Sequence, residues 1–171
     1  MRGLAERAVL RFHDDSRQCL ELDIAGHELS NFRPGHPREV LLSWPLLWIV
    51  ARDMDGEWSA EASIGSREEL MGLAGWLAAI GSGQSAAKVF RFSEPFLSLE
   101  WIGTGDRHGT MAIYLNGDLL SDSDPQRLDG ERCLRFSLDS ERLLASAEEL
   151  QRLIAEHPEP SWKTPARGTK H

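Results

Sequence analysis

The sequence lacks the cysteine pattern of a metal site or a disulfide framework. Its two cysteines, Cys19 and Cys133, lie far apart, and neither has a CxxC partner or a nearby histidine at metal-ligand spacing. We therefore expect two reduced thiols that pack as small hydrophobic side chains. The sequence also has no Gly-x-Ser-x-Gly motif and no phosphate-binding P-loop. Nothing in it predicts a bound metal or cofactor.

Long apolar runs and excess positive charge are also missing. The best helix candidate, residues 66–81, starts with charges and contains several glycines, so it is too short and too broken to span a bilayer. Met1 leads directly into charged residues, without the pattern of a signal peptide. The net charge of -8 disfavours nucleic acid and anionic membranes as partners. We expect a cytoplasmic protein that binds neither of them.

What is present indicates one packed domain. The 171 residues are 41% hydrophobic and include six Trp and six Phe, which is enough to bury a core. We assign residues 1–158 to a single domain. Residues 159–171 contain proline and are locally basic, which predicts a flexible tail. Residues 27–45 hold three prolines and are predicted to form a long loop.

Two periodicities predict the secondary structure. Leu20, Leu22 and Ile24 alternate with Cys19, Glu21 and Asp23, which is typical of a half-buried strand with an acidic outer face. Similar runs predict strands over residues 8–12, 19–26, 46–53, 57–64, 88–92, 96–103, 110–119 and 133–138, with polar loops over residues 103–109 and 121–131. Asp55-Gly56 is a hairpin-turn signal.

Helical spacing appears twice. Ser66 and Glu69 form a capping-box signature before an apolar stripe, and a glycine-containing segment ends that stripe at residues 81–83. A second stripe follows Asp139 or Ser140, both good N-caps, and ends before Pro158. The sequence therefore predicts an α+β fold. We expect a mostly antiparallel sheet of about six to eight strands, with two amphipathic helices on one face, in the order βββ(β)-α-βββ(β)-α.

The segment "RFSEPFLSLEW" joins two predicted strands through Ser93-Glu94-Pro95. Pro95 cannot donate to a sheet ladder and favours an extended Glu94, so a bend between strands explains these residues. The segment also resembles the F-x-EP-x-L-x-F-x core of the WapI-type immunity proteins. "LLWIVARDMDGEW", "SREELMGLAGWLAAIGSGQ" and "LRFSLDSERLLASAEELQRLIAEHP" are similar to further segments of that family, in the same order. The resemblance covers about residues 18–158.

The resemblance implies a non-enzymatic immunity protein that binds and neutralises a cognate toxin domain, such as a basic nuclease. An acidic partner would gain association rate and specificity against a basic toxin. We expect a monomer or a weak homodimer. The candidate partner-binding residues are Glu21, Asp23, Glu94, Glu100, Asp118, Asp122 and Asp124.

Two other functions stay open at this point. One is a different protein-binding or assembly module, for example a subunit that assembles through a sheet edge. The other is a small hydrolase using His13, Asp15 or His27, which would need these side chains to meet in a cleft. None of them stands beside a recognisable nucleophile in the sequence.

Overall fold

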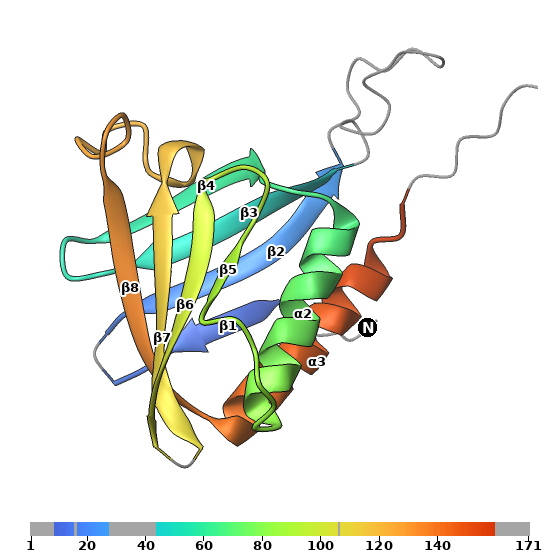
Figure 1. The fold of residues 1–171 in the computed structure, drawn as a ribbon. Helices are drawn as coiled ribbons and strands as arrows, with labels where there is room; N and C mark the ends of the chain where they lie inside the picture. The colour runs from blue at the N-terminus through green and yellow to red at the C-terminus, as the bar shows by residue number, and fades with distance from the viewer. Residues whose placement is uncertain (1–8, 16, 28–43, 106, 160–171) are drawn as a thin grey trace, which may run out of the picture.

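The computed structural model describes residues 9–15, 17–27, 44–105 and 107–159 as eight strands and two long helices (Figure 1). The first half contains β1 (Leu10–His13), β2 (Cys19–His27), β3 (Pro45–Arg52), β4 (Glu57–Ser63) and α2 (Arg67–Gly81). The second half contains β5 (Val89–Arg91), β6 (Leu97–Gly105), β7 (His108–Asn116), the short 3-10 helix η1 (Gly117–Leu119), β8 (Glu131–Asp139) and α3 (Ser140–Glu156). The predicted α+β class and element order are confirmed.

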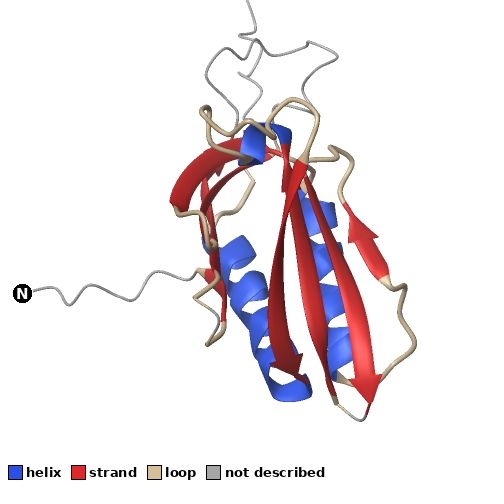
Figure 2. Ribbon diagram, turned by 90° about the vertical axis from the view of Figure 1, so that its left-hand side faces the viewer, coloured by secondary structure: helices blue, strands red, loops and turns tan. Residues whose placement is uncertain are grey.

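The strands form two antiparallel sheets of four rather than one continuous sheet. Sheet A has the order β1-β2-β3-β4 and sheet B the order β5-β6-β7-β8. Each strand pairs with its neighbour in the chain, as short turns favour. Along the chain, helix α2 lies between the four strands of sheet A and the four strands of sheet B. Figure 2 shows the two sheets facing each other, with the helices filling the space between them on one side.

The core lies between the inner faces of the two sheets. Strand alternation predicts the inward side chains correctly: Leu20, Leu22 and Ile24 are all buried. Phe12 on β1 meets Phe136 on β8 with 5.7 Å between ring centroids, so the sheets contact each other directly there. Fully burying a Leu or Phe side chain stabilises a fold by about 1.5–3 kcal/mol before entropy is counted. The shared core therefore dominates the stability of both sheets.

The two helices pack side by side in opposite directions (Figure 1). Arg67, in the first turn of α2, donates hydrogen bonds at 2.8 Å to the carbonyl oxygens of Ile154 and His157 at the end of α3. The last turn of a helix leaves its carbonyl groups short of intrahelical donors. The Ile154 carbonyl also accepts from the amide of His157, the C-cap of α3, at 3.3 Å. Asp139 caps the start of α3 by accepting from the Arg142 amide at 2.7 Å.

The Ser-Glu-Pro corner is held by the Glu69 carboxylate. Glu69 and Ser66 form the predicted capping box at the start of α2, with the Ser66 amide donating to Glu69 Oε2 at 2.7 Å. The other oxygen, Oε1, accepts from both the amide and the hydroxyl of Ser93, each at 2.7 Å. Burial raises the Glu69 pKa, but the hydrogen bonds from Ser66 and Ser93 outweigh it and leave the pKa below its ordinary value. One side chain thus joins the start of α2 to the connection between β5 and β6 of sheet B.

One loop prediction is wrong. Residues 103–109 were expected to form the loop of a polar hairpin. The hairpin is present, but β6 extends to Gly105 and β7 begins at His108, so its loop is shorter than predicted. The glycines hid the strand signal, since they place no side chain on either face. Most of the predicted loop at residues 27–45 and almost all of the predicted tail at 159–171 lie outside the described residues. Among the helices that the structure describes, none has the length and apolar character needed to cross a membrane.

We expect Glu69→Gln to lower the free energy of unfolding by about 1–3 kcal/mol at neutral pH, since it weakens hydrogen bonds to a charged acceptor. Folding lowers the Glu69 pKa, so this stabilisation is complete above the ordinary pKa of a glutamate and is lost as the pH falls through the folded-state value. Urea unfolding at neutral and acidic pH measures both effects. Glu68→Gln, on the exposed face of the same turn, is the control. Equal stability of the two variants would contradict this role.

We expect Gly75→Ala to stabilise the protein by about 0.5–1 kcal/mol, because glycine inside a helix costs backbone entropy. Gly75 lies on the exposed face of α2, and a Cβ there would meet nothing within 4 Å. Thermal unfolding of the variant measures the gain. A lower melting temperature would show that this position needs the glycine.

Candidate partner-binding surfaces

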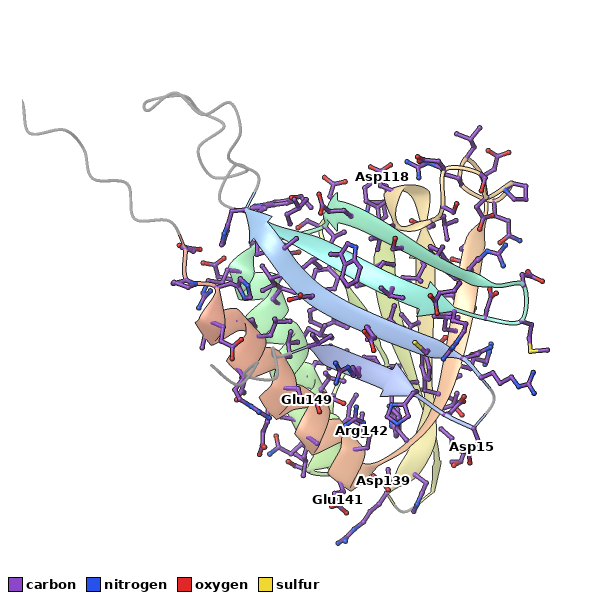
Figure 3. The ribbon with its side chains drawn as sticks, turned by 180° about the vertical axis from the view of Figure 1, so that it is seen from behind. Asp15, Asp118, Asp139, Glu141, Arg142 and Glu149 are labelled. Atoms are coloured by element: carbon purple, nitrogen blue, oxygen red, sulfur yellow. The ribbon has the colours of Figure 1, made fainter. Side chains whose placement is uncertain are left out.

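The outer face of sheet A carries an apolar stripe between acidic columns. Leu46, Trp48 and Val50 project outward from β3, while β2 and β4 contribute Cys19, Glu21, Asp23, Glu57, Ser59, Glu61 and Ser63. Two ion pairs lie on this face, between Arg11 and Glu21 at 3.3 Å and between Arg52 and Glu57 at 3.9 Å. Figure 3 views the molecule from this side. Glu21 is therefore outward, as predicted, and is paired with Arg11.

Asp23 differs from the expectation for this face. The alternation of β2 predicted an exposed carboxylate, but Asp23 is only 5% exposed. It stands opposite Trp48 in the sheet register, and a large indole next to a short side chain shields it from water. Trp48 itself remains 37% exposed, which makes it one of the few large hydrophobic side chains at the surface of the described residues. Sequence reasoning missed Trp48, whose continuous apolar strand gave no sign of an outward face.

The outer face of sheet B holds Glu100, as the alternation of β6 predicted. Tyr114 donates a hydrogen bond to Glu100 Oε2 at 2.9 Å. This hydrogen bond, together with burial, raises the pKa of the Tyr114 hydroxyl. Glu100 is thus engaged within the sheet. Ile102, on the same face, is 38% exposed.

Glu94 is half-buried at the Ser-Glu-Pro corner, and its backbone amide donates to the Ile64 carbonyl at 3.1 Å. The corner is therefore pinned to the end of sheet A by Glu94 and to α2 by Ser93. This geometry accounts for the corner as structure. It leaves the candidate role of Glu94 in partner binding as a prediction.

The loop acids at the far end of the molecule differ greatly in exposure. Asp118 and Asp122 both pair with Arg127, at 3.2 and 2.9 Å, and the Asp122 side chain is 96% exposed. Asp118 lies at the opposite end of the molecule from Asp15 and Asp139 (Figure 3). The third candidate, Asp124, is buried instead, with 4% of its side chain exposed. Its carboxylate lies 2.5 Å from Arg132 Nε.

Arg132 is the centre of a cluster that the sequence did not reveal. Its guanidinium also donates to Asp53 at 2.9 Å and to Asp55 at 2.8 Å, and it lies 5.6 Å from the ring centroid of Trp58. These partners belong to the β3–β4 hairpin, while Arg132 belongs to β8, so the cluster ties sheet A to sheet B. The three carboxylates raise the Arg132 pKa. Burial raises the Asp124 pKa, but hydrogen bonds from Arg132 and the Gln126 amide lower it by more, so the pKa lies below its ordinary value.

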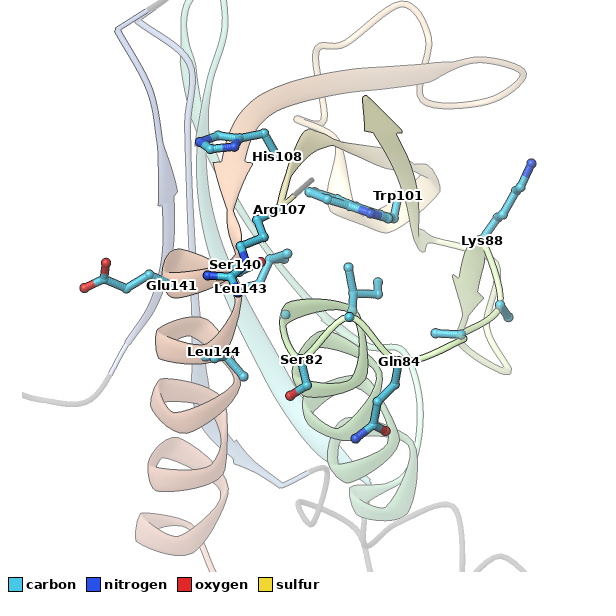
Figure 4. Close-up of a pocket in the computed structure, with 15 residues that line it drawn as sticks. Ser82, Gln84, Lys88, Trp101, Arg107, His108, Ser140, Glu141, Leu143 and Leu144 are labelled. Atoms are coloured by element: carbon cyan, nitrogen blue, oxygen red, sulfur yellow. The ribbon is translucent and has the colours of Figure 1, made fainter. Parts of the chain in front are cut away.

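A cavity of about 780 Å³ lies where α2 ends, α3 begins and the β6–β7 hairpin turns (Figure 4). Trp101 lines it, with its ring packed so closely over Gly109 that a Cβ there would lie 2.4 Å from the indole. Arg107 points toward Ser140 and Leu143, and Lys88 points away. His108 lies apart from Ser82 and Ser140 in this cavity (Figure 4).

The two histidines considered for catalysis lie at opposite ends of β2. His13 pairs with Cys19 at one end of β2, whereas His27 ends that strand eight residues away, roughly 26 Å at the usual strand rise. Asp15 lies exposed in the β1–β2 turn. No group of three or more His, Cys, Asp or Glu side chains in the described part of the chain could hold a metal ion. Both cysteines are free, as predicted, and burial raises the pKa of each thiol.

We expect Arg132→Met to lower the free energy of unfolding by about 2–4 kcal/mol, because it leaves the Asp53 and Asp124 carboxylates without their cation. Folding lowers the Asp124 pKa, so the effect is largest at neutral pH and shrinks as acid protonates the carboxylate. Denaturant unfolding against pH measures both. The control Arg52→Met removes an exposed pair and should change stability by less than about 0.5 kcal/mol. Equal effects of the two substitutions would refute the central role of Arg132.

Comparison with known proteins yields one family. The model of the WapI-like immunity protein family matches residues 11–158, from the first strand to the second residue after the last helix. No curated protein and no solved structure shows significant similarity. Because the match covers most of the chain and almost every element of the fold, the chain belongs to the WapI-like immunity protein family.

Proposed function

We propose that this protein is a non-enzymatic immunity protein that binds a cognate toxin domain and blocks its activity. The observation that carries the proposal is the family match over residues 11–158. Blocking a toxin by occupation needs a rigid scaffold and a complementary surface, and no chemical step. Two polar contacts make the fold suitable as such a scaffold. Glu69 joins α2 to sheet B, and Arg132 joins sheet B to sheet A.

We further propose that the toxin domain is basic. The chain carries a net charge of -8, and carboxylates project from sheet A and from the loop that holds Asp118 and Asp122. Complementary charge accelerates encounter and disfavours wrong partners. A nuclease domain is one basic toxin of this kind, since it must attract phosphates. In this proposal the protein acts in the cytoplasm, where such a toxin would meet its target.

An assembly module that pairs through a sheet edge is the second candidate, but side chains occupy two of the edges. Arg142 of α3 donates to the Arg11 carbonyl on β1, beside its partner Glu149 (Figure 3). Gln18 accepts from the Arg135 amide on β8 at 2.7 Å. A strand added at either place would have to displace these bonds. Docking through a face therefore fits the molecule better than edge pairing.

The test is a rescue and binding experiment. The C-terminal domain of the protein encoded by the adjacent upstream gene is expressed with and without this chain. We expect the domain alone to stop growth, co-expression to restore it, and the two proteins to elute as one complex whose affinity falls as salt rises. Co-expression of an unrelated acidic protein of similar size controls for charge alone. A toxic domain that this chain neither binds nor neutralises would refute the proposal.

A further inference from the structure

We propose that the outer face of sheet A is the docking surface for the basic partner, and that Trp48 receives an arginine or lysine side chain of that partner. This inference rests on the proposed function for the nature of the partner. The position of the site rests on the sheet itself. It assigns the contact to β2, β3 and β4, away from the cavity beside Trp101 and from the loop acids.

The register places a carboxylate on each side of the indole. Asp23 on β2 and Glu61 on β4 both stand opposite Trp48 on β3, in one row across the sheet. Side chains directly opposite each other in antiparallel strands lie about 4.5–5.5 Å apart at Cβ. A cation that sits over the ring is therefore within reach of the exposed Glu61 carboxylate, and the buried Asp23 adds negative charge beneath the ring. Indole is the preferred aromatic surface for a cation, and the planar guanidinium stacks on it while donating hydrogen bonds to carboxylates.

The surroundings of Trp48 have the composition of an interface centre. Leu46 and Val50 extend the apolar stripe on either side of Trp48 along β3, and both are partly exposed. Arg11 and Arg52, two arginines of this face, are in ion pairs with Glu21 and Glu57. Interface energy concentrates on an aromatic anchor with a polar rim. The stripe supplies the anchor, and the flanking acids supply a rim of the sign that a basic partner needs.

The other acidic regions fit a basic partner less well. Asp118 in η1 and Asp122 in the following loop share Arg127, and Asp124 belongs to the internal Arg132 cluster. On sheet B, Glu100 accepts from Tyr114. Neither region sets an exposed aromatic ring between carboxylates. Sheet A does so within a single row of its register.

The first test measures the affinity of the toxin domain from the adjacent gene for variants of the full chain. We expect Trp48→Ala and Glu61→Lys each to weaken binding at least tenfold, as loss of an interface anchor does. Two controls match them elsewhere on the surface: Ile102→Ala removes an apolar side chain of equal exposure, and Glu156→Lys reverses an exposed charge on α3. Both should bind within twofold of wild type. Glu61→Lys keeps the test valid if Trp48→Ala folds poorly, which thermal unfolding checks.

Wild-type affinity in both sheet A variants, with rescue by the wild-type chain, would overturn this inference and leave the proposed function standing. A wild-type dimer that Trp48→Ala converts to a monomer would assign the face to a second copy and also overturn it.

The second test does not need the toxin. The peptide acetyl-Arg-Gly-Arg-Gly-Arg-amide is titrated into the isotope-labelled protein, and amide and indole resonances are followed by NMR. We expect the largest shifts at the Trp48 indole and along β2, β3 and β4, and their loss in Glu61→Lys. Largest shifts at the Asp118–Asp122 loop or on sheet B would overturn the site. Shifts at Trp48 without any rescue of the toxin domain would support the site and refute the proposed function.

Discussion

Burial of apolar surface between two sheets is the constraint on which the rest of this structure depends. Each four-stranded sheet has one apolar face, and neither sheet can remove that face from water alone. The second sheet and the helix pair must cover it together, as the contact between Phe12 and Phe136 illustrates. The polar ties act within this arrangement. Glu69 fixes α2 against sheet B, and Arg132 fixes sheet A against sheet B. If these elements shifted, the Ser93 donors would lose Glu69 and the Asp53 carboxylate would lose Arg132, which is costly.

The periodic parts of the fold could be predicted because they follow local rules. The alternation of β2 and the capping box of Ser66 and Glu69 depend on residues close in sequence, and both appear as expected. The division into two sheets could not be read in this way, since it depends on which strand edges remain unpaired after folding. The extent of the loop at residues 103–109 was predicted wrongly for a local reason, because its glycines contribute no alternation of apolar and polar side chains.

The candidate surface was predictable in part. Strand alternation placed Glu21 and Glu100 on outward faces. It failed for Asp23, whose exposure is set by the neighbouring strand. Asp124 was a candidate as a loop acid, but its carboxylate is buried against Arg132, eight residues away across the loop. The exposure of Trp48 also depends on how the strands and helices assemble, which residues close in sequence do not reveal. A nearly continuous apolar strand indicates burial on both faces, and only the assembled layers show that one face stays open.

The family assignment and the geometry together favour recognition through a rigid face. In a preorganised face, the side chains that meet a partner are already ordered, so little conformational entropy is lost on binding. The side chains on β3 are held by neighbours on both sides, whereas those on the loop after η1 have neighbours on fewer sides. A sheet face with a central aromatic ring therefore offers a more defined contact than an acidic loop of the same charge.

The position of α3 also has a consequence in time. This helix is the last element described in the chain, yet it packs against β1 and β2, the first two strands, and buries Leu150 and Leu153 completely. During synthesis, sheet A leaves the ribosome long before the residues that cover it. The core cannot close until about residue 156 has emerged, so the two halves of the chain complete folding together rather than in succession. Sheet A thus stays incompletely covered until the residues of α3 have been made.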